Sequence, residues 1–362
     1  MEYCDKRETR SLKVETSSAI YEVVFGQIQI EITGKCNMFC QHCRAADEKG
    51  IDMPVKQIVK VLKFARKYSP SHKELVISGG EPLLHNDFFN LLPVIKEAGG
   101  ESISLTTNGA LLDISHLWLI NSLDFKCFRL SISLDALKPE EHDEFRQKKG
   151  AFNAAIKAID LAVNSGIANF SVSVRTTVRP HQISEMEAIA ELVYQKGCDR
   201  INFSSVHPSG RALTRPDFWM TPKEKRRFIE EVYRLKNAFG RNLQITTNDP
   251  LKCLVRGYSN EMIEDELIFN GCVAGCVSFN VCVDGRMTPC ALMNFPMMNI
   301  SQMSVDEISD AYRRNSIVHN MLEMNLKGRC GACSKKYECG GCRARALGRS
   351  GDYLAEDPDC WL

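Results

Sequence analysis

The sequence predicts an α/β fold built on a parallel sheet, and two features predict it. From Gln27 onward, short apolar runs of strand character alternate with longer amphipathic stretches of helical character. Each strand-like run is separated from the next by enough residues for a crossover helix, which parallel strands require. The chain of 362 residues is long enough to bury a large core and to form more than one domain.

The elements follow in a regular order. The expected strands are rich in β-branched and aromatic residues and cover 27–33, Glu74–Ser78, Ser102–Thr106, Phe128–Leu134, Phe170–Thr177 and Arg200–Ser205. The expected helices between them lie near 55–69, 87–98, 113–121, 150–165 and 183–196. An open twisted sheet and a partial barrel both fit this rhythm. In either fold the chemistry belongs at the carboxyl ends of the strands.

A cysteine-rich loop follows the first expected strand. Cys36, Cys40 and Cys43 are separated by three and two residues, and one loop of this kind can wrap an iron–sulfur cluster because each thiolate is a strong iron ligand. Three ligands leave one iron of a four-iron cluster open to a ligand from outside the protein. A closed zinc site is the alternative, and it needs a fourth Cys or His, for which the ring of His42 would have to point back past the loop.

This loop resembles the cluster loop of the radical S-adenosylmethionine (SAM) superfamily, although that family usually has an aromatic residue where His42 stands. The resemblance implies a partial (β/α)6 TIM-like barrel rather than an open sheet. It also implies that Cys36, Cys40 and Cys43 hold a 4Fe-4S cluster with catalytic function. Its reduction would cleave SAM to methionine and a 5′-deoxyadenosyl radical, which abstracts hydrogen from an unactivated carbon.

Motifs at the ends of later strands resemble the SAM-binding segments of the same family. They are a Gly-Gly-Glu-Pro motif, a Thr-Asn-Gly segment, a Ser-Leu-Asp segment and an arginine that pairs with the carboxylate of SAM. The residues carried over as cofactor contacts are Gly79, Gly80, Glu81, Pro82, Thr106, Asn108, Ser133, Asp135 and Arg146. Without the resemblance, the glycines are an ordinary turn and Arg146 belongs to a charged helix face.

The segment 207–212 follows the sixth expected strand and resembles a Pro-x-Gly-Arg segment found in one branch of the family. Two interpretations of Arg211 stay open. Its guanidinium can clamp a carboxylate of the substrate, or the segment can be a structural turn.

A second group of cysteines lies near the carboxyl terminus, where nine of the 16 fall between Cys272 and Cys360. In a reducing compartment this number of thiols favours metal ligation over disulfides. Four of them in paired C-x2-C spacing could form a zinc ribbon. The thiols exceed the needs of one tetrahedral site, which favours more than one cluster.

The region resembles the SPASM extension of radical SAM enzymes, which carries two auxiliary clusters. The two-residue gap between Cys339 and Cys342 departs from the usual three. The resemblance implies three 4Fe-4S clusters in all, one that binds SAM and two auxiliary. The implied outer auxiliary ligands are Cys330, Cys333, Cys339 and Cys360. The implied inner ligands are Cys272, Cys290 and Cys342, with Cys276 as the candidate fourth, Cys282 in reserve, or an open iron.

The expected domains are an N-terminal extension (1–26), the radical SAM partial barrel (27–212), a bridging segment (213–270) and a small Cys-rich α+β SPASM domain (271–362). The bridging segment should contain helices near 222–238 and 260–268 and a short strand at 242–246. A strand from Ser278 to Val283, followed by Asp284-Gly285, predicts a hairpin. The remaining cysteines, Cys4, Cys127, Cys198 and Cys253, are expected to be small apolar residues.

The charges are balanced, with 46 Lys and Arg against 45 Asp and Glu and a formal net charge of +1. Nothing electrostatic points to nucleic acid or an anionic membrane. The sequence has no run of 18 apolar residues and its start lacks the apolar core of a signal peptide, so we expect a cytoplasmic protein without membrane contact.

The substrate is the least determined part. The favoured interpretation is a maturase that cross-links, epimerises or oxidises a ribosomally made peptide, with a separate leader-peptide recognition protein or binding at the barrel mouth. Ala291 stands after Cys290 where sulfatase-maturing members have an acidic residue. The alternative is decarboxylation of tetrapyrrole side chains of a haem precursor or other small-molecule radical chemistry, and the outside alternative is a non-enzymatic iron–sulfur or zinc module. A flavodoxin- or ferredoxin-type electron donor is implied.

Overall fold

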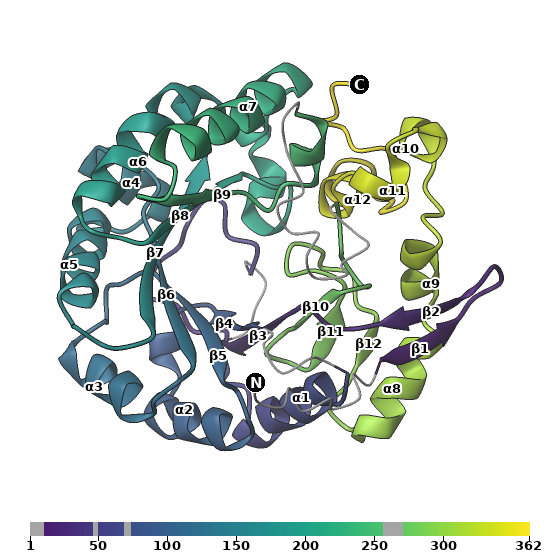
Figure 1. Cartoon of the computed structure of the whole chain (residues 1–362), viewed down its shortest axis with the longest axis horizontal. Coiled ribbons are helices and arrows are strands. Elements are labelled where there is room, and N and C mark those ends of the chain that lie inside the picture. Colours follow the sequence, from purple (N-terminus) through teal and green to yellow (C-terminus); the bar gives the residue numbers. More distant parts are fainter. Residues whose placement is uncertain (1–10, 46–49, 69–73, 256–270) are drawn as a thin grey trace, which may run out of the picture.

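The structure is a computed structural model that describes residues 11–45, 50–68, 74–255 and 271–362. Its centre is a curved parallel sheet that follows the order of the chain from β3 to β9. The strands are β3 (Gln27–Thr33), β4 (Glu74–Gly79), β5 (Ser102–Thr107), β6 (Cys127–Ser133), β7 (Phe170–Val178), β8 (Arg200–Ser205) and β9 (Gln244–Thr246). The sheet curves without closing on itself, so the predicted α/β partial barrel is confirmed (Figure 1).

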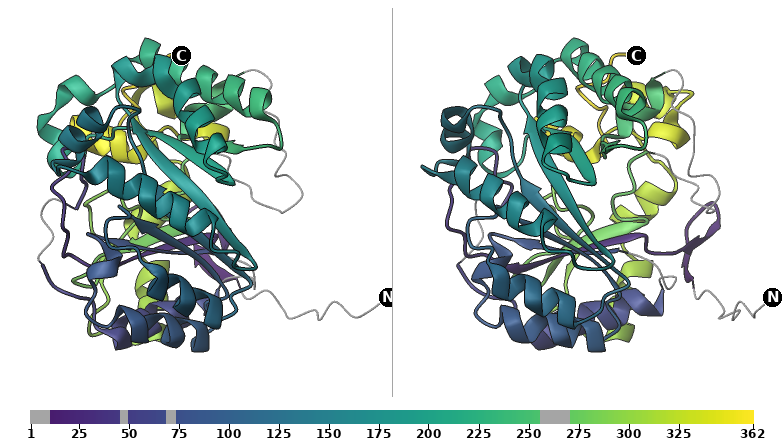
Figure 2. Two further views of the ribbon diagram at one scale, coloured as in Figure 1. Left: turned by 90° about the vertical axis from the view of Figure 1, so that its left-hand side faces the viewer. Right: turned by 60° about the vertical axis from the view of Figure 1, so that its left-hand side comes forward.

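Helices cover the outer face of this sheet (Figure 2). They are α1 (Val55–Lys67), α2 (Phe88–Glu97), α3 (Ile114–Ser122), α4 (Pro139–Arg146), α5 (Ala151–Val163), α6 (Met186–Gln195) and α7 (Pro222–Phe239). All of them except α4 were expected from the sequence. The pattern missed α4 because its eight residues are mostly charged, and only a few, such as His142 and Phe145, are buried.

The two faces of the sheet differ in chemistry. On β3, β6 and β7 the alternate apolar residues belong to the core beneath the helices, as Ile30, Ile132 and Val174 do. Successive side chains of a strand point to opposite faces, so the residues between them face away from the helices, toward the inside of the barrel. These inward positions are polar, among them Glu31, Ser133 and Arg175. The barrel therefore has an apolar outer face and a polar inner face.

The C-terminal part continues the same sheet. The strand β10 (Ser278–Val281) pairs in parallel with β3, and β11 (Arg286–Thr288) and β12 (Met298–Asn299) follow in antiparallel order. The predicted hairpin is thus present, and it adds to the barrel edge. Short helices complete this part: α8 (Val305–Arg313), α9 (Ser316–Leu322), α10 (Gly328–Ala332), α11 (Lys336–Cys339) and α12 (Arg343–Ser350). They lie beside the open side of the curved sheet (Figure 1).

The N-terminal residues and the bridging segment are described only in part. Within residues 1–26, β1 (Leu12–Glu15) and β2 (Ile20–Val23) form an antiparallel hairpin. The helix expected near 260–268 and Cys4 lie outside the described residues. The division into four domains stays a prediction.

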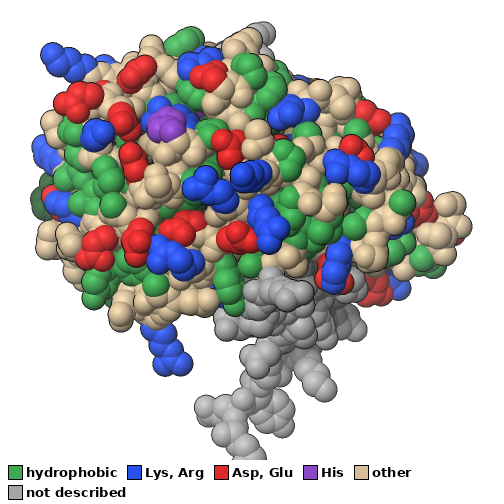
Figure 3. Space-filling model, turned by 90° about the horizontal axis from the view of Figure 1, so that it is seen from above, with side chains coloured by type: hydrophobic (Ala, Val, Ile, Leu, Met, Phe, Trp, Pro, Cys, Tyr) green, Lys and Arg blue, Asp and Glu red, His purple; other side chains and the backbone are tan. Residues whose placement is uncertain are grey.

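The surface agrees with the balanced composition, because the face shown in Figure 3 carries basic and acidic side chains side by side. Within the described segments, the helices all fall short of the length and apolarity that a membrane crossing needs.

Candidate functional site

The predicted cluster loop follows β3 at the carboxyl end of the sheet and brings its three thiols together. Burial raises the pKa of the Cys36 thiol to about 11, and the neighbouring Cys40 and Cys43 add to the rise. Burial also raises the pKa of Cys40, which again has Cys43 among its charged neighbours. Thiols grouped in this way become thiolates together only with a cation beside them, which the iron of a bound cluster would supply.

The loop is held by segments far away in the sequence. The amides of Phe39 and Gln41 donate to the carbonyls at the end of α4, at 3.3 and 2.9 Å. Arg211 donates from its backbone amide to the Cys43 carbonyl at 3.0 Å and from Nε to the Cys40 carbonyl at 2.8 Å. Its guanidinium also stacks on the ring of Phe39, 3.8 Å from the centroid. Both donor groups of Arg211 therefore support the loop, which favours the structural interpretation over a substrate clamp.

His42 packs as an aromatic residue. Its ring stacks on Phe145 with centroids 4.2 Å apart and an angle of 17° between the planes. Burial lowers the pKa of His42 to about 3, and the nearby Arg146 lowers it further. The ring is neutral at physiological pH and serves where the family usually has an aromatic side chain.

Glu81 of the Gly-Gly-Glu-Pro motif connects several of the predicted SAM-binding segments. Its side chain is buried and accepts hydrogen bonds from the Thr107 hydroxyl at 2.7 Å and from the Asn108 amide at 2.8 Å. The Asn108 side chain in turn donates to Asn37 of the cluster loop at 2.7 Å. The motif thus fixes the ends of β4 and β5 against the loop that carries the cysteines.

The backbone at the two glycines of this motif leaves no room for a side chain. Gly79 has φ of +144°, and a Cβ there would lie 2.3 Å from the Thr33 carbonyl oxygen. A Cβ on Gly80 would lie 2.1 Å from the Lys35 carbonyl oxygen. The motif was expected to let a ligand approach the backbone. In the structure it lets β4 approach the start of the cluster loop, and Pro82 then begins a 3-10 turn.

Other predicted SAM contacts lie at the ends of β5 and β6. Thr106 is on the inner face, and the Ser133 hydroxyl shows no hydrogen bond to the described residues. Asp135 and Arg146 form a buried ion pair at 2.6 Å. Burial opposes ionisation of Asp135, but Arg146 outweighs it and lowers the pKa of the carboxyl to about 2. Arg146 therefore has a partner within the protein, whereas the resemblance implied a role on the carboxylate of SAM.

The predicted inner auxiliary ligands gather in one apolar cluster, because Cys342 is buried there with Cys272 and Cys290 packed against it. Cys276, the candidate fourth ligand, is buried in the main core, against which Cys272 also packs. Burial and the charge of Cys272 both raise the pKa of Cys276. The reserve ligand, Cys282, is buried near Arg44, as its effect on the pKa of that guanidinium indicates.

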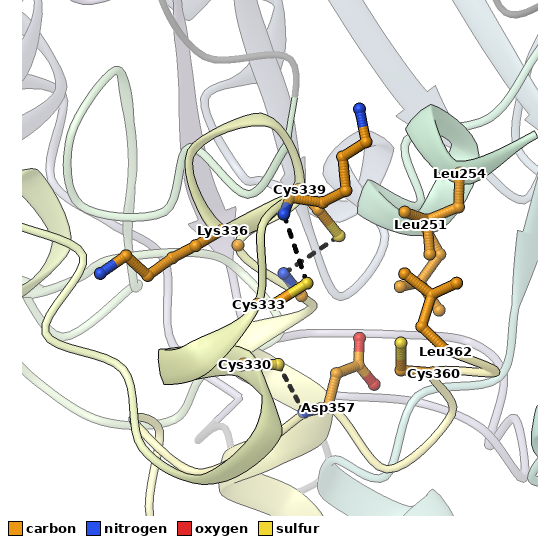
Figure 4. Close-up of a pocket in the computed structure, with 12 residues that line it drawn as sticks. Leu251, Leu254, Cys330, Cys333, Lys336, Cys339, Asp357, Cys360 and Leu362 are labelled. Atoms are coloured by element: carbon orange, nitrogen blue, oxygen red, sulfur yellow. Dashed lines mark hydrogen bonds between the residues drawn. The ribbon is translucent and has the colours of Figure 1, made fainter.

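The four predicted outer auxiliary thiols line one pocket (Figure 4). They are Cys330, Cys333, Cys339 and Cys360. Backbone amides donate to three of the sulfurs: Asp357 to Cys330 at 3.3 Å, Lys335 to Cys333 at 3.4 Å and Gly341 to Cys339 at 3.4 Å. Amides directed at sulfur stabilise thiolates and tune cluster potentials.

Cys253 lies beside this pocket, although the sequence suggested an ordinary apolar residue. Its thiol hydrogen-bonds Cys339 and donates to the Pro250 carbonyl at 3.2 Å. A paired spacing could not have revealed it, because the residue lies 86 positions from Cys339 along the printed sequence.

A buried network of charges joins the barrel to the C-terminal part. Arg345 binds Asp249 through both carboxylate oxygens, at 2.6 and 3.0 Å, and Asp357 at 2.7 Å. Lys225 binds Asp249 at 3.0 Å, and Asp359 completes the network. All five side chains are nearly inaccessible to solvent.

The thiol sets suit polynuclear clusters. Within the described part of the chain, no three or more His, Cys, Asp or Glu side chains are arranged around a single metal ion. Sulfurs that line a pocket, with amides directed at them, fit a 4Fe-4S cluster better than one zinc ion.

A parallel barrel that is open on one side and carries a three-cysteine loop at its carboxyl edge defines an iron–sulfur enzyme of the radical type. Residues 30–193 match the family model of the Radical SAM superfamily, which identifies this part of the chain as a radical SAM domain. The SPASM assignment of the C-terminal cysteines stays a prediction.

Several sequence relatives span nearly the whole chain. The chain is 29% identical to the AdoMet-dependent heme synthase of Methanosarcina barkeri, over 91% of this chain and 94% of the relative. It is 25% identical to the AdoMet-dependent heme synthase of Nitratidesulfovibrio vulgaris, over 91% and 90%. A probable GTP 3′,8-cyclase of Saccharolobus solfataricus is 26% identical, over 78% and 88%.

Solved structures share the fold. Streptococcus suis SuiB bound to precursor peptide SuiA has a TM-score of 0.73 at 18% identity, over 94% of this chain and 77% of that chain. The enzyme anSMEcpe with bound AdoMet has a TM-score of 0.68 at 18% identity, over 92% and 93%.

Two inward residues were not singled out from the sequence. Glu31 and Arg44 form a buried ion pair, and Arg44 also donates to the Ala291 carbonyl at 3.1 Å. Arg44 follows Cys43 and Ala291 follows Cys290, so this contact joins the cluster loop to the inner auxiliary region. The polar alternation of Gln27-Ile28-Gln29-Ile30-Glu31 was the available signal.

Proposed function

We propose that this protein is a radical SAM enzyme that decarboxylates carboxylate-bearing side chains of a tetrapyrrole, as a heme synthase would. One observation carries the proposal: relatives named heme synthase match 91% of this chain over 90% or more of their own length. The likeness to the peptide-bound SuiB is at 18% identity and supports the fold alone. The heme-type activity was the alternative in the sequence interpretation, and it now takes the place of the peptide maturase.

Three groups of cysteine thiols would hold the cofactors. Cys36, Cys40 and Cys43 would hold the SAM-binding cluster, and the two C-terminal thiol sets would hold the auxiliary clusters. When bound, the first cluster supplies the electron that splits SAM, and the auxiliary clusters supply an electron acceptor. The barrel contributes position and exclusion of water.

The proposed reaction balances. Bound SAM would supply a 5′-deoxyadenosyl radical, and the substrate carbon beta to a carboxylate would lose one hydrogen atom to it, which gives 5′-deoxyadenosine. The carbon–carboxyl bond then breaks, CO2 leaves, and a carbon–carbon double bond forms. One electron has to leave the substrate, which explains why an electron acceptor is needed besides the SAM site. An external flavodoxin or ferredoxin would supply the electron for SAM cleavage.

The test is an anaerobic assay of reconstituted protein with dithionite, SAM and coproporphyrin, either metal-free or loaded with iron. We expect 5′-deoxyadenosine and CO2 to form in parallel, with a matching loss of mass from the porphyrin. The Cys43→Ala variant is the control for any reaction of SAM or porphyrin with dithionite that does not need the predicted cluster. Release of 5′-deoxyadenosine without any porphyrin product, together with modification of a short peptide encoded beside the gene, would return the assignment to a peptide maturase.

A further inference from the structure

Arg175 lies on the inner face of the barrel and has no hydrogen-bond or ion-pair partner among the residues that the structure describes. It lies on β7 opposite Ser133 of β6, and its side chain is half-buried. Its guanidinium makes no hydrogen bond or ion pair to any residue in the described part of the chain. Burial and the neighbouring Arg44 both lower its pKa, which means that its surroundings oppose its charge. An arginine stays charged even so, so an anion here would be stabilising.

The neighbouring charges are already compensated. Arg44 is paired with Glu31, and Arg146 is paired with Asp135. Arg44 and Arg146 are close enough to lower the pKa of Arg175, and Asp135 is close enough to raise it. Since each pair is internally neutral, Arg175 is left as the uncompensated positive charge among these groups.

The position of Arg175 relates it to two parts of the predicted machinery. Its strand neighbour Ser133 is a predicted SAM contact. The predicted inner auxiliary ligand Cys290 also lies near enough for its charge to act on the guanidinium. The side chain is thus near both a predicted SAM contact and a predicted auxiliary ligand.

We propose that Arg175 is the specificity-determining residue that binds a carboxylate of the substrate. A guanidinium offers paired donors that match the two oxygens of a carboxylate. A carboxylate held here would place the adjoining side-chain carbons on the inner face, toward the predicted SAM position. The identity of the carboxylate bearer as a tetrapyrrole rests on the proposed function, whereas the anion preference of Arg175 rests on the structure.

The experiment compares Arg175→Gln and Arg175→Lys with the wild-type protein after anaerobic reconstitution. Arg200→Gln is the matched control, because Arg200 is a partly buried arginine at the opposite end of the neighbouring strand β8, where it donates to Thr246 at 3.2 Å. The measurements are iron content, the electron paramagnetic resonance spectrum, binding of radiolabelled SAM and binding of coproporphyrin by absorbance titration. The methyl ester of coproporphyrin serves as the same ring without carboxylates.

We expect Arg175→Gln to weaken coproporphyrin binding by about tenfold to a hundredfold, the range for losing a hydrogen bond to a charged group. Arg175→Lys should weaken it less. Binding of the methyl ester should not respond to either variant. Iron content, the spectrum and SAM affinity should match those of the wild type, and Arg200→Gln should bind coproporphyrin like the wild type.

Three other results would contradict the proposal that Arg175 binds a carboxylate of the substrate. A parallel loss of SAM affinity in Arg175→Gln would assign Arg175 to the carboxylate of SAM. A loss of iron or an altered spectrum would assign it to compensating a cluster's charge. Unchanged coproporphyrin binding in Arg175→Gln would remove the inference but leave the proposed function, whereas a wild-type protein that binds neither porphyrin would remove the proposed function as well. The unfolding midpoint of Arg175→Gln in urea should not fall, since the change removes an unpaired cation.

Discussion

The carboxylate of Asp357 accepts a hydrogen bond from the backbone amide of Cys342 at 2.6 Å. The amide of Asp357 in turn donates to the Cys330 sulfur at 3.3 Å. One buried residue thereby joins a predicted inner auxiliary ligand to a predicted outer one. It also anchors both to the barrel, because its carboxylate pairs with Arg345, which binds Asp249.

We expect Asp357→Asn to destabilise the protein by about 3 to 5 kcal/mol, the usual cost of removing one member of a buried ion pair. Asparagine keeps the shape and one acceptor, so the loss reports mainly on the charge that Arg345 would leave uncompensated. Urea unfolding under anaerobic conditions measures the change. Glu356→Gln is the control, since Glu356 pairs with Arg329 at the surface, where water screens the pair and its loss has little effect on stability. Equal effects of the two substitutions would contradict a special role for Asp357.

Replacement of Cys36, Cys40 and Cys43 by Ala together should lower the iron content by about four atoms per chain and abolish reductive cleavage of SAM. The reason is that these thiols are the predicted iron ligands of the loop. Iron analysis and release of 5′-deoxyadenosine are the measurements. Cys127→Ala, a change at the start of β6, should leave both unaltered. SAM cleavage that persists in the triple variant would refute the assignment.

Arg211→Ala should reduce SAM cleavage and substrate turnover together, because the side chain supports the Cys40 carbonyl and stacks on Phe39. If Arg211 instead bound substrate, SAM cleavage without substrate would be preserved and only turnover would fall. Comparing the two rates in one preparation decides between these outcomes. Leu213→Ala is a control in the same turn, since Leu213 is 47% exposed.

The fourth inner ligand can be tested with a pair of alanine variants. Cys272→Ala should lose the iron of the inner auxiliary site, because Cys272 lies in the same apolar cluster as Cys342 and Cys290. Cys276 lies in the main core, so Cys276→Ala should keep that iron and lower stability by about 1 kcal/mol through the lost packing. Iron analysis with Mössbauer spectroscopy distinguishes them. Loss of the same iron signal in both variants would make Cys276 the fourth ligand.

Acidification from pH 7 to 5 should destabilise the protein. Burial lowers the pKa of His142 to about 4 and that of His207 to about 3. Below the ordinary value of 6.5, the unfolded chain therefore binds protons that the folded chain does not, and stability falls with pH until the folded-state pKa is reached. His142, whose ring is buried, contributes about 1 to 2 kcal/mol over this interval, and the half-buried His207 contributes less.

Urea unfolding at pH 7, 6 and 5 measures this slope. The variant His142→Gln should show a shallower slope, because one of the responsible groups is gone while an acceptor for the Asp135 amide is retained. A midpoint that does not change between pH 6.5 and 5 would contradict the neutral, buried state of these rings.

The sequence by itself determined the class of fold and the groups of residues that carry chemistry. Periodicity and the need for crossover helices located β3 to β8 to within one or two residues, because these signals are local along the chain. The spacing of Cys36, Cys40 and Cys43 within one loop is local too. The same holds for the paired spacing of Cys330 and Cys333.

Only the tertiary structure decided which residues from distant segments meet. It placed Cys253 beside Cys339, turned Arg211 toward the cluster loop, paired Arg146 with Asp135 and left Arg175 without a hydrogen bond or ion pair to the described residues. The physical reason is that pairing and burial of charges depend on contacts between strands and loops far apart in sequence. A one-dimensional pattern records that a residue is charged, and the fold decides whether that charge is already neutralised or still open to a ligand.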